Sequence, residues 1–162
     1  IVTLRGNVDT RLRKLREGAV DATVLALAGL RRLDRDEPTA SVIDVTEMLP
    51  AVGQGTIAIE CREDAADIKT LLARIDDPAT AVCLTAERSM LAALDGSCQT
   101  PIGGLAQTDG DLLSLEGLVA TPDGKVVHRL THEAQRADAV ALGTGVGTAL
   151  HELAPPELFA AW

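Results

Sequence analysis

Only two aromatic side chains, Phe159 and Trp162, occur in this chain of 162 residues. Aromatic rings normally supply much of the buried apolar area of a domain, so the core has to be built from Leu, Val, Ile and Ala. Hydrophobic residues make up 46% of the sequence, which is enough for such a core. The same scarcity excludes stacking on aromatic rings as the way to hold a planar ligand or nucleic-acid bases.

The charge balance and the cysteines exclude further classes of protein. Acidic residues number 24 against 15 basic ones, and the net charge of −9 argues against a nucleic-acid binder. No apolar run approaches the roughly 18 residues of a membrane span, and residues 1–5 do not resemble a signal peptide. Three cysteines without a CxxC pair indicate free thiols in a reducing cytoplasm. His128 and His132 lack further ligands nearby in the sequence, so no metal site is expected.

Residues 1–77 have the pattern of an α/β fold with a parallel sheet. A continuous apolar run at 20–27 is typical of a strand buried on both faces. Short helical segments follow each of the first two strands, as in βαβ units. The expected strands are 1–4, 20–27 and 56–61, and the expected helices are 11–17, with Asp9 or Thr10 as its cap, 28–33 and 65–75. A chain that opens directly on a strand is expected to be a piece of a longer protein.

Residues 78–162 predict a separate small α+β domain. Apolar residues recur at helical spacing over 80–94 and 136–153. Between these helices, strands near 101–108, 111–120 and 124–132 are separated by turn residues, which predicts an antiparallel meander. The glycines of Gly143–Gly147 resemble part of a dinucleotide fingerprint, but the helical period continues through them and favours a plain helix.

Three arginines are candidates for binding an anion. Arg5, Arg11 and Arg32 each follow a predicted strand, at the sheet edge where ligands usually bind. Together they would hold a polyanion through bidentate bonds. The alternative, that they are solvated surface arginines, stays open and is favoured by their spacing alone. The Gly53-Gln54-Gly55 stretch is either a hinge or a place of close approach to a ligand.

Cys98 lies between glycines and a proline in a loop that follows the helix 80–94. A loop thiol in this setting can be a nucleophile, or it can be an ordinary thiol without a role. Cys61 and Cys83 lie within regular elements and are expected in the core.

Six motifs, taken together and in order, resemble the porphobilinogen deaminase family. They are LRGNVxTRL at 4–12, LAxAGLxRL at 25–33, LPAVGQG at 49–55, IECR at 59–62, AER at 86–88 and CQxPIG at 98–103, where x is a position that the motif leaves open. The resemblance implies an enzyme that condenses four porphobilinogen units into linear hydroxymethylbilane and releases ammonia. It also implies a dipyrromethane cofactor joined to Cys98 by a thioether, since loss of ammonia leaves an electrophile that a thiolate traps.

The resemblance gives roles to individual residues. It implies that Arg5, Arg11 and Arg32 bind the carboxylates of the cofactor and substrate, that Ala26 and Ala28 lie by the cofactor, and that Gln54 binds substrate by a hinge. It further implies that Glu87 and Arg88 dock the small domain through an ion pair.

The resemblance also implies a domain plan with a missing part. Residues 1–48 correspond to the latter part of a second periplasmic-binding-protein-like domain, 49–77 to a hinge and crossing segment, and 78–162 to an α+β domain carrying Cys98. The catalytic aspartate of the family falls in a first half that this sequence lacks, so the chain alone is expected to be inactive and to need that N-terminal segment as a partner. The alternative is a non-catalytic carboxylate-binding module of periplasmic-binding-protein type.

Overall fold

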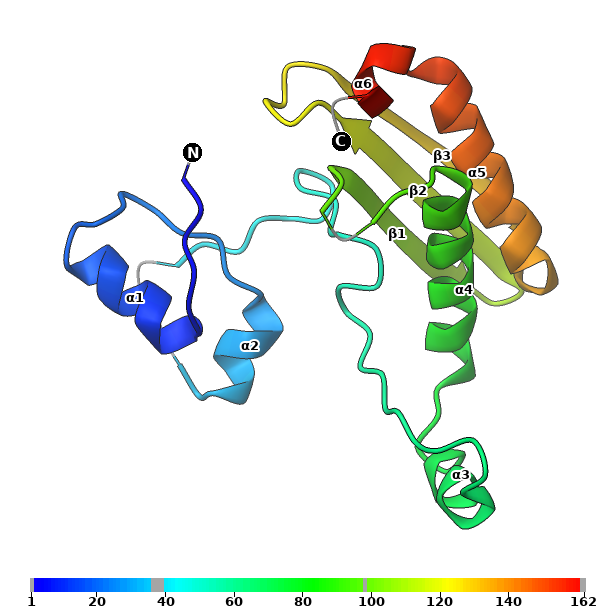
Figure 1. The fold of residues 1–162 in the computed structure, drawn as a ribbon. Helices are drawn as coiled ribbons and strands as arrows, with labels where there is room; N and C mark the ends of the chain where they lie inside the picture. Colours follow the sequence, from blue (N-terminus) through cyan, green and yellow to red (C-terminus); the bar gives the residue numbers. More distant parts are fainter. Residues whose placement is uncertain (1, 36–39, 98, 161–162) are drawn as a thin grey trace. The chain divides into compact units, whose positions relative to one another are not determined.

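The computed structural model describes residues 2–35, 40–97 and 99–160, and it divides into two compact units. The first unit is Ile1–Asp44 and the second is Val45–Trp162. Most of the regular structure belongs to the second unit (Figure 1).

The first unit contains two short helices, α1 (Val8–Arg16) and α2 (Leu27–Arg32). Asn7 caps α1, because its side-chain oxygen accepts the Thr10 N–H at 2.9 Å. The helix therefore begins earlier than expected, and neither Asp9 nor Thr10 is its cap. Leu12 and Leu30 are the buried apolar residues of these helices.

The strands expected at 1–4, 20–27 and 56–61 are not formed in the described parts of those segments. Apolar side chains in them face solvent, with Val2 72%, Val24 63% and Ile57 66% exposed. A strand is completed by hydrogen bonds to a neighbour, and the described residues supply no neighbour for these segments. The described residues therefore do not form a periplasmic-binding-protein-like sheet by themselves, and the helices are the part of the α/β prediction that is confirmed.

The second unit holds the α+β domain that the sequence predicts. A short helix α3 (Ala66–Leu72) precedes α4 (Pro78–Ala93), whose N-terminus is capped by the Asp77 side chain. The antiparallel strands follow in the order β1-β2-β3. Their bounds are Ile102–Asp109, Leu112–Ala120 and Val127–Gln135. A single turn of 3-10 helix, η1 (Arg136–Asp138), leads to α5 (Ala139–Leu153) and α6 (Pro156–Ala160).

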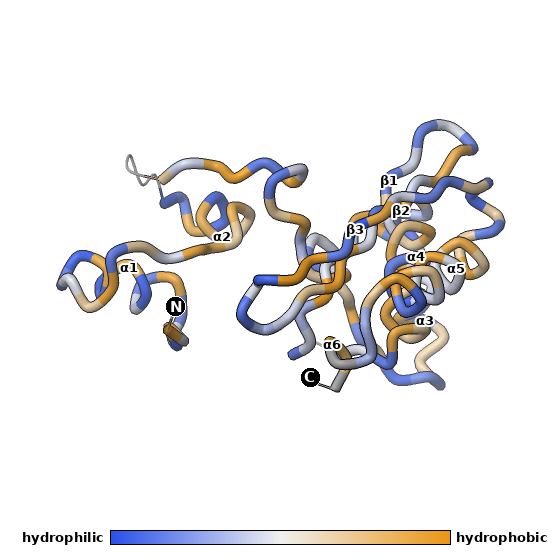
Figure 2. The backbone as a smooth tube through the Cα atoms, turned by 90° about the horizontal axis from the view of Figure 1, so that it is seen from above, coloured by the Kyte–Doolittle hydropathy of each residue, from blue (hydrophilic) through white to orange (hydrophobic). Residues whose placement is uncertain are grey.

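The core lies between the sheet and the two long helices. Alternate residues of β2, including Leu113, Leu115 and Val119, are fully buried against Met90 of α4 and Val146 of α5. Hydrophobic residues predominate along these helices and only a few hydrophilic ones interrupt them, as Figure 2 shows. The aliphatic core inferred from the scarcity of aromatic rings is confirmed.

Candidate functional site

The first two candidate arginines lie on either side of the turn at Gly6, with Arg5 before it and Arg11 within α1. Gly6 has φ +127°, and a Cβ there would lie 2.7 Å from Cγ2 of Thr10, so only glycine fits. Arg11 donates from Nε to the Gly6 carbonyl at 2.9 Å, and Lys14 donates from Nζ to the Arg5 carbonyl at 3.1 Å. These bonds tie the turn to the helix and orient the Arg11 guanidinium.

The third arginine, Arg32, lies exposed in the last turn of α2. Ala26 is the residue at the N-cap of this helix, and both Ala26 and Ala28 are exposed. These residues of the first unit, which are expected to lie by the cofactor, are therefore at the surface of that unit.

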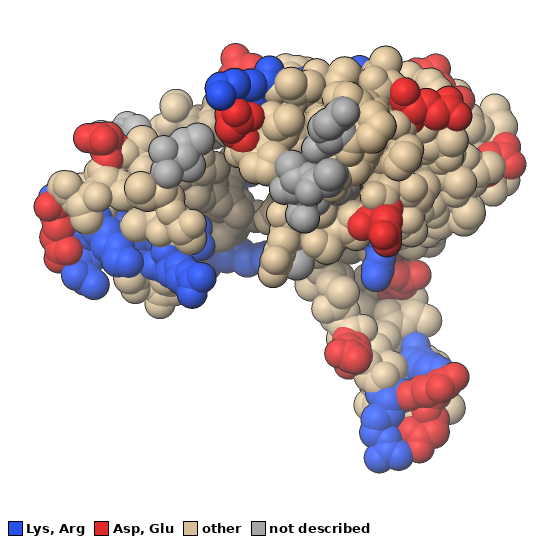
Figure 3. Space-filling view, turned by 45° about the horizontal axis from the view of Figure 1, so that its top comes forward, with Lys and Arg blue, Asp and Glu red and all other residues tan. Residues whose placement is uncertain are grey.

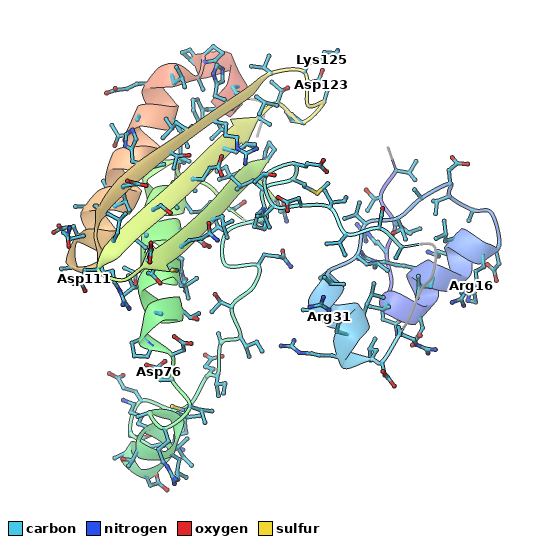
Figure 4. All side chains as sticks on the ribbon, turned by 180° about the vertical axis from the view of Figure 1, so that it is seen from behind. Arg16, Arg31, Asp76, Asp111, Asp123 and Lys125 are labelled. Atoms are coloured by element: carbon cyan, nitrogen blue, oxygen red, sulfur yellow. The ribbon has the colours of Figure 1, made fainter. Side chains whose placement is uncertain are left out.

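Basic side chains gather on the first unit, as the space-filling view shows (Figure 3). Arg16 extends from α1 and Arg31 from α2 (Figure 4). Some cations are neutralised locally, since Arg13 pairs with Glu17 at 2.9 Å and Arg35 with Asp9 at 2.7 Å. By contrast, Arg5, Arg11 and Arg32 form no ion pair with another described residue, which leaves their charges available for an anion.

Cys98 lies outside the described residues, but the loop on either side of it is defined. Gly96 follows α4 so tightly that a Cβ would lie 2.4 Å from Cδ1 of Ile102. The Thr100 hydroxyl donates to the Ser97 carbonyl at 2.7 Å and accepts the Ser97 N–H at 2.9 Å. Ser97 and Gln99 are both exposed. The loop is thus a short, hydrogen-bonded connection between α4 and β1.

Gln54 is exposed in a turn that lines a hollow of about 300 Å³ within the second unit. The Gln54 N–H donates to the Ala51 carbonyl at 3.0 Å, and the preceding Gly53 has φ +68°. Cys83 and Glu87 of α4 also line this hollow. Burial raises the pKa of the Cys83 thiol above its ordinary value of 9.0, and the charge of Glu87 raises it further.

Glu87 is a buried charged residue of the described core, with 7% of its surface exposed. Its Oε2 accepts the Gly53 N–H at 2.7 Å, and its Oε1 accepts the Ala106 N–H at 2.9 Å. Backbone amides satisfy the Glu87 carboxylate and Arg88 lies exposed, so the docking role expected for this pair stays a prediction. The sequence contained one signal for this arrangement, a glutamate placed among apolar residues on the buried side of a helix.

Comparison with known proteins matches two consecutive family models to this chain. Residues 1–70 match the model described as "Porphobilinogen deaminase, dipyromethane cofactor binding domain", and residues 81–152 match "Porphobilinogen deaminase, C-terminal domain". The chain belongs to the porphobilinogen deaminase family. The cofactor of porphobilinogen deaminases is accordingly the dipyrromethane that the sequence motifs imply.

Curated porphobilinogen deaminases from two Nitrobacter species are similar over nearly the whole chain. The protein of Nitrobacter winogradskyi is 50% identical over 157 residues, and that of Nitrobacter hamburgensis is 49% identical over 159 residues. These matches cover 97% and 98% of this chain but 50% of each relative. The chain therefore spans about half the length of these porphobilinogen deaminases.

The two matched regions divide the candidate residues. The cofactor-binding match contains Arg5, Arg11, Ala26, Ala28, Arg32 and Gln54, and the C-terminal match contains Cys98.

Across the described ranges, no group of three or more His, Cys, Asp or Glu side chains is arranged to hold a metal. None of the described helices is long and apolar enough to cross a membrane.

Proposed function

We propose that this chain is part of a cytoplasmic hydroxymethylbilane synthase, which joins four porphobilinogen units head to tail and releases one ammonia per unit. The observation that carries the proposal is the ordered match of both family regions at about 50% identity. Porphobilinogen and its oligopyrrole products are the partners that follow from this activity.

The side chains present fit a dipyrromethane held at Cys98. Each pyrrole ring carries two carboxylates, and Arg5, Arg11 and Arg32 supply guanidinium groups that are not neutralised by described acids. Ser97 and Gln99 are both exposed, and this supports the proposal that a pyrrole can approach the loop. When bound, the cofactor supplies the free pyrrole position to which the first substrate is joined. The chain's own task is to neutralise carboxylates that would otherwise repel one another.

We further propose that two things lie in the half of the relatives that this chain does not span. They are the catalytic acid and the strands that would pair with the apolar segments of this chain. The exposed apolar side chains at 2–4, 20–27 and 56–61 support this, because pairing with additional strands of periplasmic-binding-protein type would bury them. Residues 1–48 and 49–77 would then complete two α/β domains, with 78–162 as the third.

The test combines activity with intact mass. The full-length gene product is expected to convert porphobilinogen to hydroxymethylbilane and to carry the added mass of two pyrrole units, whereas this chain alone turns over nothing. Replacement of Cys98 by Ser should abolish both the adduct and turnover, and replacement of Cys61 by Ser should change neither. Binding of porphobilinogen without adduct or turnover would overturn the proposal in favour of a carboxylate-binding module.

A further inference from the structure

The segment Pro50–Gly55, here called the strap, is fastened to the α+β domain along the free edge of β1. The Pro50 carbonyl accepts the Gly104 N–H at 2.9 Å, and Ala51 forms a bridge with Gly103. Upstream of the strap, the Thr46 carbonyl accepts from Arg129 of β3 at 2.7 Å. Leu49 is buried and packs within 3.3 Å of where a Gly103 Cβ would lie.

Beyond Gly104, where the strap no longer pairs with β1, the Glu87 side chain occupies the edge of the strand. Ala106 comes two residues after Gly104, so its N–H points to the same side of β1. Glu87 accepts that N–H with one oxygen and the Gly53 N–H with the other. Because the carboxylate is charged and shielded from water, both bonds are stronger than ordinary amide hydrogen bonds. One side chain of α4 thus joins the strap to the sheet.

The consequence concerns Gln54, which directly follows the tethered Gly53. We infer that Glu87 is a positioning residue that holds Gln54 in its turn, and that the strap moves with the α+β domain rather than acting as the hinge. That Gln54 contacts the substrate rests on the proposed function. The flexible point then lies outside Pro50–Gly55, contrary to the hinge expected at Gly53–Gly55.

Hydrogen exchange of the full-length gene product tests the tether without reference to activity. Glu87→Gln keeps the size of the side chain but presents an NH₂ group to one of the two amides. The amide that faces the NH₂ group loses its acceptor, so at least one of the Gly53 and Ala106 amides should exchange about 10- to 100-fold faster, as expected for the loss of a hydrogen bond to a charged group. Glu152→Gln, the same change at an exposed position of α5, should leave them unchanged. Unchanged protection at both Gly53 and Ala106 in Glu87→Gln would overturn the inference.

Steady-state kinetics then test whether Glu87 acts through Gln54. Glu87→Gln and Gln54→Ala should each raise KM for porphobilinogen by about 10-fold with little change in kcat, and the double variant should be no worse than the poorer single one. Effects that multiply would overturn the positioning role. If the protein shows no deaminase activity, the proposed function fails, while the exchange experiment still decides the tether. Should Glu87→Gln not fold, Glu87→Asp keeps the charge but shortens the reach and is measured in its place.

Discussion

Gly143 of α5 lies directly against the backbone of α4 at Ala86. A Cβ at Gly143 would fall 2.1 Å from the Ala86 carbonyl oxygen and 2.7 Å from Cβ of Ser89. Gly147, one turn later, would place its Cβ 2.7 Å from the Met90 carbonyl oxygen. The two helices therefore meet backbone to backbone, and two of the glycines that resemble a nucleotide fingerprint, Gly143 and Gly147, are packing residues.

The first prediction compares two glycines of α5. Gly143→Ala should lower the free energy of unfolding by about 1–3 kcal/mol or more, since the new methyl group has to push α4 away. Gly145→Ala should raise it by about 0.5–1 kcal/mol, because nothing lies within 4 Å of its Cβ and alanine favours the helix. Urea denaturation of both variants measures the difference. Equal effects of the two substitutions would contradict the close approach.

The second prediction concerns Arg11. Its Nε bond to the Gly6 carbonyl orients the planar guanidinium, and lysine cannot reproduce this geometry. In the full-length gene product, Arg11→Lys should raise KM for porphobilinogen by about 10-fold or more, the value of one charge-assisted bond. Arg13→Lys on the same helix is the control, because Arg13 is already engaged by Glu17. A similar KM for both variants would show that Arg11 does not bind the substrate.

The third prediction follows from the raised pKa of Cys83. The folded state favours the neutral thiol, so this contribution to stability is complete below the ordinary value of 9.0 and is lost as pH rises through the folded pKa. In a variant with Cys61 and Cys98 replaced by Ser, alkylation by iodoacetamide should have its pH midpoint above 9.0. The same variant unfolded in urea provides the reference midpoint. A folded midpoint at or below that reference would show that the thiol is not shielded.

The fourth prediction concerns the turn between β2 and β3, where Asp123 and Lys125 lie together (Figure 4). The pKa of Asp123 is lowered from 3.8, first by the Thr121 hydroxyl that donates at 2.6 Å and then by Lys125. Its contribution to stability is present above 3.8 and is lost as pH falls through the lower folded value. Thr121→Val should raise this pKa more than Lys125→Met does, as followed by NMR titration of the carboxyl carbon. The reverse order would make the ion pair the main cause.

Local patterns in the sequence were sufficient to predict the α+β domain. The period of apolar residues gives a helix at 80–94 and the structure has Pro78–Ala93, while the three strands agree within a few residues. Turns at Gly110 and Gly124, both with positive φ, separate the strands as expected. These features depend on neighbours in the chain, so a single sequence contains them. The ordered motifs likewise determined the family.

Only the tertiary structure decided which segments pair and which charges are buried. The apolar segment at 20–27 has the composition of a strand, but a strand forms only where another strand accepts its hydrogen bonds. The bond between Gly53 and Glu87 joins residues 34 positions apart, and no local pattern specifies that distance. The close approach at Gly143 also depends on α4, a separate element. Long-range contacts of this kind are set by how whole elements pack, which the order of residues along one element does not reveal.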